Sequence, residues 1–311
     1  MSSEILTFGE PMFEFSQIKE RDSADADFLS GFGGDVSNFA IAAARQGANV
    51  GIFTHLGADA FGSEFLKLWQ RESVHSDLVV SSQTAHTGVY FITHDEQGHH
   101  FSFLRKGSAA SLIQPHQLPI DAIKAAKLLH VTAITQAISA NSCDAVFEAL
   151  EVARANNTLV SYDTNLRLKL WSLQRARGVI SETIRHVDIC FPSLDEAQLL
   201  TGLNHPDEII DYYLKLGARI VVLKKGGEGA TVATESERFS ILPHKVTPVD
   251  ATAAGDSFAG SFCTHYVRGA NLEEALAYAN ATASITITGY GAVAPLPTLA
   301  QVEARLNEAK A

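Results

Sequence analysis

Short apolar segments alternate with longer amphipathic segments along most of the chain. Apolar runs rich in β-branched residues predict strands, and apolar residues that recur every three to four positions predict helices. The predicted strands cover residues 5–9, 50–56, 128–132, 159–163, 188–191 and 220–224. The predicted helices cover residues 37–46, 61–71, 143–155, 173–186, 255–268 and 272–288. This order predicts an α/β protein with a mostly parallel central sheet and helices on both faces.

Two segments, at about residues 11–30 and 84–105, break this rhythm. Apolar and polar residues alternate in the second of them, at Val89 and Phe91 and again at Phe101 and Phe103, which predicts strands. We expect a small β-sheet with no helix of its own, inserted into one domain that spans residues 1–311. An uncovered sheet of this kind predicts a lid over a site or an interface with a second copy of the chain.

Composition narrows the class of protein and of partner. Of 311 residues, 46% are hydrophobic and 19% are charged, which is typical of a chain with a large core. No run of about 18 apolar residues predicts a membrane span, and the first residues do not resemble a secretory signal. The formal net charge of -11 disfavours nucleic acid and anionic lipid as partners. Three widely spaced cysteines without a CxxC pair favour the reducing cytoplasm.

The strongest signal for chemistry is residues 250–258, DATAAGDSF, which lead directly into a predicted helix. The small residues Ala253, Ala254 and Gly255 let the backbone approach a ligand, and the free N–H groups of the helix start bind anions. Asp256 lies within this anion hole. It is either a general base for a hydroxyl that attacks phosphorus or an acidic first-turn residue that only offsets the helix dipole.

A second candidate site precedes the first predicted helix. Gly33 and Gly34 permit close approach of the backbone to a polar ligand, and Asp35 and Asn38 follow them. Asn38, one turn into the helix, is placed to bond a sugar hydroxyl. Glycine pairs before helices also occur without any ligand, so this segment alone decides little.

Two further segments follow predicted strands, at the sheet edge where ligands of open α/β sheets bind. Residues 163–167, DTNLR, end on Arg167, whose guanidinium suits a carboxylate, a phosphate or a surface ion pair. Residues 222–229, VLKKGGEG, form a strand and a glycine turn suited to a nucleotide. Neither GxGxxG nor GxxxxGK[ST] occurs there, which disfavours a dinucleotide oxidoreductase and a Walker-type NTPase.

Together these segments resemble the PfkB (ribokinase-like) family of sugar kinases over nearly the whole chain. Its N-terminal pattern corresponds to Gly33, Gly34, Asn38, Gly47 and Gly57. Its C-terminal pattern, usually DTTGAGD, corresponds to residues 250–256, with Ala251 for a usual Thr and Ala253 for a usual Gly. Ala253 still has a small side chain, so we expect the anion hole to be kept. Ala251 lacks the hydroxyl that could contact a monovalent cation. The resemblance implies a ribokinase-like three-layer sandwich with a small β-sheet lid.

The resemblance also implies roles for the matched residues. Asp256 would be the catalytic base, and the amides of Ala253, Ala254 and Gly255 would stabilise charge on the transferred phosphoryl group. ATP would lie against Ser193, Lys224, Gly226, Gly229 and Asn280. Mg²⁺, carried by the ATP phosphates, would lie near Asn165 and Glu196. A monovalent cation such as K⁺ is a further candidate cofactor.

Residues 163–171, DTNLRLKLW, match the pattern DxNxRxxLW, which fructokinases and 2-keto-3-deoxygluconate kinases of this family share. The segments 33–35 and 103–110 resemble the second group, which implies a substrate wall of Gly33, Gly34, Asp35, Asn38, Tyr90, Phe103, Arg105 and Arg167. A sugar acid loses hydration of its carboxylate on binding, so charge-assisted bonds must offset that loss. Arg105 and Arg167 are the candidates for this task, with a solvent- or subunit-facing lid residue as the alternative for Arg105.

The expected activity is therefore ATP-dependent phosphorylation of the terminal hydroxyl of 2-keto-3-deoxygluconate. The expected enzyme is cytoplasmic and forms a homo-oligomer through its β-lid. A fructokinase or another PfkB sugar kinase is the alternative. A catalytically silent nucleotide or sugar sensor is a third hypothesis, which the presence of Asp256 and Glu196 disfavours.

Overall fold

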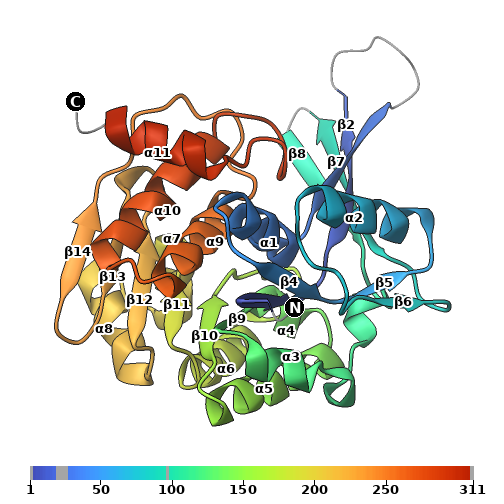
Figure 1. The fold of residues 1–311 in the computed structure, drawn as a ribbon, viewed down its shortest axis with the longest axis horizontal. Coiled ribbons are helices and arrows are strands. Elements are labelled where there is room, and N and C mark those ends of the chain that lie inside the picture. Colours follow the sequence, from blue (N-terminus) through green and yellow to red (C-terminus); the bar gives the residue numbers. More distant parts are fainter. Residues whose placement is uncertain (1–2, 19–26, 96–97, 309–311) are drawn as a thin grey trace.

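The computed structural model describes residues 3–18, 27–95 and 98–308. Its largest element is an eight-stranded sheet in the order β14-β13-β12-β11-β10-β9-β1-β4 (Figure 1). The parallel strands are β1 (Ile5–Phe8), β4 (Val50–Phe53), β9 (Leu128–Thr132), β10 (Leu159–Asp163), β11 (Ile189–Phe191) and β12 (Ile220–Lys224). Two antiparallel strands, β13 (Ala230–Ala233) and β14 (Arg238–Ile241), complete one edge. The predicted mostly parallel sheet is confirmed.

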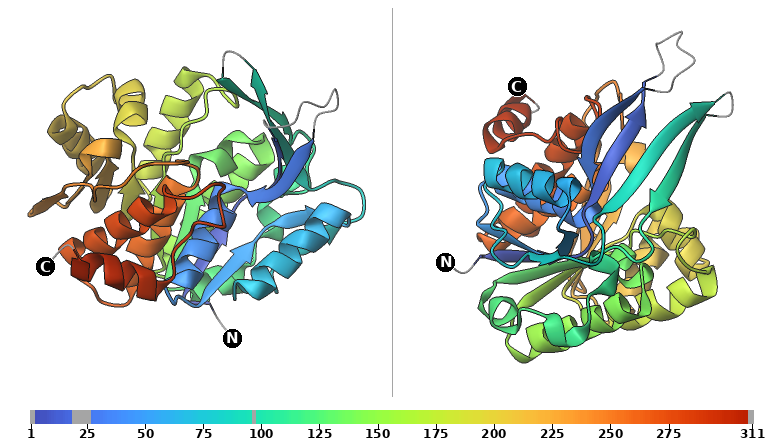
Figure 2. Two further views of the ribbon diagram at one scale, coloured as in Figure 1. Left: turned by 90° about the horizontal axis from the view of Figure 1, so that it is seen from above. Right: turned by 90° about the vertical axis from the view of Figure 1, so that its right-hand side faces the viewer.

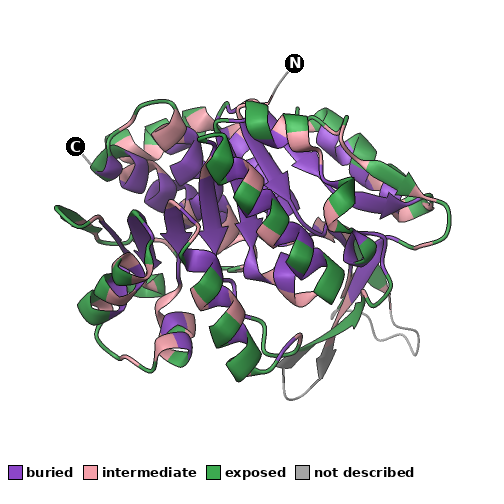
Figure 3. Cartoon of the chain, turned by 90° about the horizontal axis from the view of Figure 1, so that it is seen from below, coloured by how far each residue is buried: buried purple, intermediate pink, exposed green. Residues whose placement is uncertain are grey.

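Helices cover both faces of this sheet, because neighbouring strand residues point to opposite sides. Ile5 belongs to the core formed with α1 (Asp35–Arg45), α2 (Ala60–Arg71), α9 (Ala254–Val267) and α10 (Leu272–Thr286). Leu6 belongs to the core formed with α3 (Ile120–Ala125), α5 (Ala140–Ala155), α6 (Leu173–Ile184), α7 (Leu194–Thr201) and α8 (Pro206–Leu216). Figure 2 shows the resulting layers, and Figure 3 shows that exposed residues gather on the outer sides of the helices. This is the expected ribokinase-like sandwich.

A smaller sheet projects beside the large one (Figure 2). Its order is β3-β2-β7-β8, with β2 (Met12–Gln17), β3 (Phe28–Gly33), β7 (Gly88–Asp95) and β8 (Gly98–Leu104). These strands come from the two segments predicted to form the lid, whose residues 19–26 and 96–97 lie outside the described residues.

One expectation about the lid is wrong, since a helix does cover part of it. The ring of Phe13 lies 4.9 Å from that of Phe61 in α2, and the ring of Phe32 lies 5.2 Å from that of Phe65. The predicted helix at residues 61–71 therefore supports one face of the lid at its base.

The segment at residues 50–56 was predicted as one strand but forms two. β4 ends at Phe53, and β5 (His55–Gly57) pairs with β6 (Val80–Ser82) in a separate two-stranded sheet. The carbonyl of Thr54 accepts a hydrogen bond from the amide of Val80, so the chain leaves the large sheet at this residue. Periodicity could not show this change of partner. Five helices were not predicted: α3, α7 and α8, and the two not yet named, α4 (Ala133–Ala137) and α11 (Leu299–Glu308).

Within residues 3–18, 27–95 and 98–308, no helix combines the length and the apolar character that a bilayer span requires.

Candidate active site

The predicted site residues meet at the carboxyl edge of the large sheet. Thr132, Asp163 and Lys224 are the last residues of β9, β10 and β12. Oγ1 of Thr132 donates to Oδ2 of Asp35 at 2.5 Å, and Nζ of Lys224 donates to Oδ2 of Asp163 at 2.6 Å. Asp35 and Asp256 lie in the first turns of α1 and α9 and bring two carboxylates to this edge. Ligands of open α/β sheets bind at the same edge.

The start of α9, where an anion hole was predicted, differs from that prediction at one amide. Ala253 precedes the helix with φ 61° and ψ 7°, which is a left-handed conformation. The amide of Ala254 donates to the carbonyl of Ala251 at 3.2 Å, so it closes a turn. A Cβ added at Gly255 would lie 3.3 Å from Nζ of Lys224. A lysine ammonium therefore stands beside the helix start, and Ala253 and Gly255 carry the amides best placed for an anion.

Asp256 has the surroundings of a general base. Nδ2 of Asn38 donates to its Oδ2 at 2.8 Å. Burial, and after it the negative charge of Asp35, raises the pKa of Asp256 to about 7, from an ordinary value of 3.8. A base is most effective when its pKa lies near the working pH, since it is then both ionised and basic enough to accept a proton.

Asp35 is buried near Asp256 and forms hydrogen bonds with neighbouring polar residues. Burial raises the pKa of Asp35, although its hydrogen bonds with Thr132 and with the amide of Val36 oppose that rise. Nδ2 of Asn165 lies 3.4 Å from Oδ2 of Asp35. Asn165 has φ 23° and donates its amide to Oδ1 of Asp163, which fixes the turn after β10.

The lid contributes an aromatic wall and a carboxylate. The rings of Tyr90 and Phe103, which pair across β7 and β8, are stacked at 5.9 Å. A Cβ at Gly33 would lie 2.5 Å from the hydroxyl oxygen of Tyr90, so only glycine allows this approach. The Tyr90 hydroxyl donates to Oε2 of Glu14, and burial raises the pKa of Glu14. The sequence analysis missed Glu14, whose partner is 76 residues away.

Both arginines expected to bind a carboxylate already contact one. Nε of Arg105 donates to Oε2 of Glu10 at 2.8 Å. Nη1 of Arg167 donates to Oε1 of Glu196 at 3.2 Å, and the Arg167 side chain is 51% exposed. The charges of both arginines oppose the rise in the pKa of Asp35, so both lie within electrostatic reach of the site.

A pocket of about 810 Å³ opens on the other side of the α9 start. It includes Ala254 and Gly255 and extends between α7, the turn after β12, residues 243–251 and α10. The side-chain amide of Asn280 donates to the carbonyl of Leu242 at 3.0 Å and so holds one wall. Five of the seven residues predicted to bind the nucleotide line this pocket: Ser193, Lys224, Gly226, Gly229 and Asn280.

Other predicted nucleotide-side residues lie outside this lining. Asn165 is bonded to Asp35, on the sugar side. Glu196 contacts Arg167, and burial, followed by the charge of Asp163, raises the pKa of Glu196. The pocket instead contains three basic residues that the sequence analysis did not single out: Lys225, His244 and Lys245. Lys225 directly follows the predicted strand, but nothing local marks the other two.

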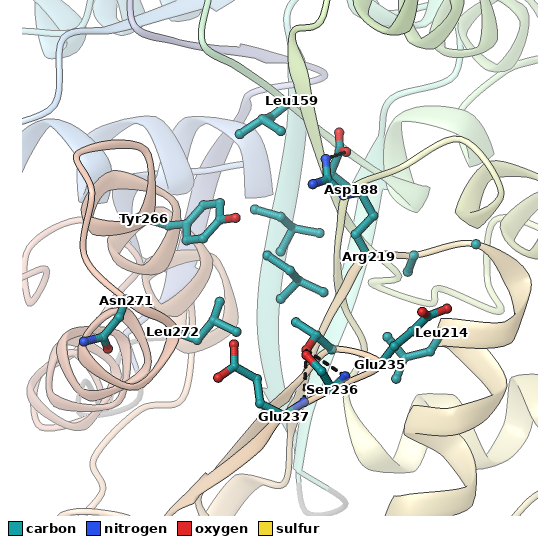
Figure 4. Close-up of a pocket in the computed structure, with 15 residues that line it drawn as sticks. Leu159, Asp188, Leu214, Arg219, Glu235, Ser236, Glu237, Tyr266, Asn271 and Leu272 are labelled. Carbon is teal, nitrogen blue, oxygen red and sulfur yellow. Dashed lines mark hydrogen bonds and ion pairs between the residues drawn. The ribbon is translucent and has the colours of Figure 1, made fainter.

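A second hollow, of about 650 Å³, lies at the opposite edge of the large sheet (Figure 4). It is lined by the amino ends of β10, β11 and β12, and an ion pair of 3.1 Å joins Arg219 to Asp188 on its rim. None of the predicted site residues lies there, so we place the active site at the carboxyl edge.

The family profile of the pfkB carbohydrate kinases matches residues 2–299. The chain belongs to the PfkB family of carbohydrate kinases. A 2-dehydro-3-deoxygluconokinase (another name for 2-keto-3-deoxygluconate kinase) from Dickeya dadantii is 31% identical, over 95% of this chain and 98% of its own. Fructokinase-1 from Oryza sativa is 32% identical over 96% of each chain. Two substrate names thus occur among PfkB relatives of similar identity.

Solved structures of PfkB kinases share the fold. A fructokinase from Vibrio cholerae, in a form with fructose, ADP and calcium ion bound, has a TM-score of 0.85. It is 25% identical to this chain, and the match covers 98% of this chain and 100% of that one. Membership of the PfkB family therefore accounts for both the three-layer fold and the kinase chemistry.

Proposed function

We propose that this PfkB kinase transfers the γ-phosphoryl group of ATP to the terminal hydroxyl of 2-keto-3-deoxygluconate, which gives 2-keto-3-deoxy-6-phosphogluconate. The observation that carries the proposal is the position of Asp256. Its helix start lines the 810 Å³ pocket on one side, and its carboxylate contacts Asn38 and neighbours Asp35 on the other. A base between a nucleotide pocket and a sugar wall is the arrangement that in-line phosphoryl transfer requires.

Asp256 would take the proton of the attacking hydroxyl as the oxygen–phosphorus bond forms. The amides of Ala253 and Gly255 and the ammonium of Lys224 would stabilise the negative charge on the transferred group. Asp163 holds Lys224 in place through the 2.6 Å bond. Burial alone would lower the pKa of Lys224, but Asp163, Glu196 and Asp256 raise it, so the lysine stays charged.

The residues on the nucleotide side fit ATP with Mg²⁺. The pocket falls in the size range of small-molecule sites, and Lys224, Lys225 and Lys245 supply positive charge along it. Carboxylate and amide oxygens suit Mg²⁺, which neutralises phosphate charge when bound. Glu196 and Asn165, which lie outside the pocket lining at the carboxyl edge of the sheet, offer such oxygens.

A monovalent cation is a weaker fit at the segment before α9. Ala251 brings no side-chain oxygen there, and both oxygens of Asp250 accept hydrogen bonds, from Thr252 and from the amide of Gly291. We propose that any K⁺ contact of this kinase would use backbone carbonyls of that segment.

An acid substrate is supported by the cationic groups of the sugar side. Arg105 is 12% exposed and its guanidinium lies 5.8 Å from the centre of the Phe103 ring. A partly buried guanidinium that retains free N–H groups is a strong partner for a carboxylate. Arg167 is the second candidate, because its ion pair with Glu196 is exposed and holds it weakly.

Fructose is the second candidate, and two observations favour it. Glu10 already neutralises Arg105, and Glu14 adds a carboxylate to the lid wall. A neutral sugar would meet acceptors for its hydroxyls there and no uncompensated positive charge. The two candidates therefore differ in whether Arg105 contacts the substrate as a cation.

An assay of ADP release with ketodeoxy acids, fructose and ribose as acceptors tests the proposal. We expect the highest kcat/KM with 2-keto-3-deoxygluconate, and a loss of about 10- to 100-fold in Arg105→Ala with that acid. Arg185→Ala, an exposed arginine after α6, is the matched control and should change little. A preference for fructose that survives Arg105→Ala would establish the second candidate. No ADP release with any acceptor would favour a silent sensor.

We also propose that the enzyme forms a homo-oligomer through its lid. The strands β3 and β8 are the outer strands of the small sheet, and Leu29 and Leu104 on them are 65% and 60% exposed. Unpaired edges with apolar side chains favour association with a second sheet.

A further inference from the structure

A buried carboxylate that the proposed reaction does not use lies between the two sheets. Glu10 follows β1 and precedes β2, and its side chain is 0% exposed. Its Oε2 accepts hydrogen bonds from Nε of Arg105 at 2.8 Å and from Nη2 of the same residue. Its Oε1 accepts the hydroxyl of Ser108. One side chain of the core thus binds the loop that follows β8 at two points.

Two glycines pack closely against Glu10, one at its carboxylate and one at its backbone. A Cβ at Gly88 would lie 2.9 Å from Oε1 of Glu10. A Cβ at Gly34 would lie 2.6 Å from the Glu10 carbonyl oxygen, and Gly34 has φ 95°, which favours glycine. The position of the carboxylate is therefore set by packing before any substrate binds.

The same contacts fix one edge of Arg105 and leave the other edge available. Nε and Nη2 bind Glu10, whereas Nη1 has no hydrogen-bond partner among the described residues. The stacked ring of Phe103 lies on the guanidinium at 5.8 Å, and the Arg105 charge reaches Asp35 at the sugar side. An arginine held this way keeps two N–H groups for a further acceptor.

We propose that Glu10 is a positioning residue that presents the free edge of Arg105 to the carboxylate of the sugar acid. The inference rests on the proposed function, since it assigns the Arg105–substrate contact a fixed geometry. Restricting a long arginine side chain in advance removes part of the entropy loss on binding. The partner charge also compensates a guanidinium that would otherwise lie buried and unpaired.

A double-mutant cycle on Glu10→Ala and Arg105→Ala tests this role. Each single variant should raise KM for 2-keto-3-deoxygluconate by about 10- to 100-fold, the effect of losing a charge-assisted hydrogen bond. The kcat and the KM for ATP should change by less than about threefold, because chemistry at Asp256 is untouched. The double variant should match Arg105→Ala alone, since Glu10 acts only through that arginine.

Two further variants separate positioning from folding. Glu10→Gln keeps the shape and an acceptor for Arg105, so it should fold and should retain more of the acid-sugar affinity than Glu10→Ala. Ser108→Ala removes the other bond to Glu10 without touching the arginine, and its KM should rise less than about threefold. Thermal unfolding of every variant checks that the KM effects are measured on folded protein.

The failure of this inference can be told apart from failure of the proposed function. If the wild-type enzyme turns over only fructose, the acid-sugar proposal fails and this inference fails with it. If the enzyme accepts the acid sugar, the cycle tests the inference alone, and non-additive KM effects with that sugar support the positioning role of Glu10. The positioning role would be overturned if the KM increases of the two single variants multiplied in the double variant. An equal loss in kcat and in ATP affinity would also overturn it.

Discussion

Asp256 must bind a proton more tightly than a carboxylate does in water, and its ionised form must also lie next to a phosphate site. Burial and Asp35 raise its pKa, while Asn38 and Lys224 stabilise its ionised form. The start of α9 and the ammonium of Lys224 reduce the repulsion of an incoming phosphate. The pKa of about 7 results from the opposing effects of burial and Asp35 on one side and Asn38 and Lys224 on the other.

The pH dependence of kcat should follow this carboxylate. Below pH 7 the protonated form cannot accept a proton, so kcat should fall about tenfold per pH unit once the pH is well below the pKa. Asp35→Asn removes the second largest cause of the shift and leaves Asp163 and Lys224 in place, so the midpoint should move to lower pH. Asp121→Asn, at an exposed carboxyl in α3, should leave the midpoint unchanged. An unmoved midpoint in Asp35→Asn would contradict the coupling.

Ala253 carries backbone strain at the same helix start. A non-glycine residue in the left-handed region costs about 1 kcal/mol, and this family usually has glycine at the position. Ala253→Gly should therefore raise the free energy of unfolding by up to about 1 kcal/mol, as measured by urea denaturation. Ala259→Gly, within the same helix, should lower it. A loss of stability in Ala253→Gly would show that the left-handed turn is not strained.

The sequence singled out most of the residues that the structure brings together at the candidate site, but not how they pair. Asp256, Asn38 and Lys224 follow glycines or end strands, which local patterns reveal. Glu10 and Glu14 do not belong to any motif. Their hydrogen-bond partners lie 95 and 76 residues further along the chain. Contacts of that separation depend on how the lid folds onto the sheet, which periodicity does not encode.

At the scale of elements, α2 links the lid to the core through its cap. Asp59 precedes α2, and its side chain accepts the amide of Gly62 at 2.8 Å, as an N-cap does. The same carboxylate accepts the amide and the hydroxyl of Thr87, both at 2.8 Å, just before β7. One side chain therefore fixes the start of a helix and the entry to a lid strand.

Asp59→Ala should lower the free energy of unfolding by about 1–2 kcal/mol, the usual effect of losing a cap. Losing the two hydrogen bonds from Thr87 should lower it further. Denaturant titration measures it, with the slope of the transition compared between variants. Asp121→Ala in the first turn of α3 is the matched control and should lie within about 0.5 kcal/mol of the wild type. Equal losses in the two variants would contradict the role of the cap.

Elements with strong periodicity were predicted well, and elements defined by tertiary contacts were not. β9, β10 and β12 have the predicted bounds because each is a largely buried strand that begins with at least two apolar residues. The strands β13 and β14, which are antiparallel and lie at one end of the sheet order, were not predicted. The break after Phe53 depends on a pairing with β6, 27 residues later.

At the scale of the whole molecule, the lid is the part that a second copy would contact. Light scattering should give about twice the mass of one chain. Leu104→Glu should shift the protein to a monomer, because it places a charge on an apolar sheet edge. Leu199→Glu, at an exposed leucine of α7, should not. A wild-type monomer at micromolar concentration would contradict association through the lid.

The decisive experiment is the Asp256→Asn variant, assayed for kcat, ATP affinity and thermal unfolding together. We expect kcat to fall about 10²- to 10⁴-fold, the range for losing a general base, with little change in ATP affinity. Because the pKa of Asp256 is higher in the folded state than in the unfolded chain, its ionisation lowers the stability of the fold as pH rises from about 4 to 7. The variant should thus unfold at an equal or higher temperature than the wild type at pH 8. Normal turnover in the folded variant would rule out Asp256 as the base.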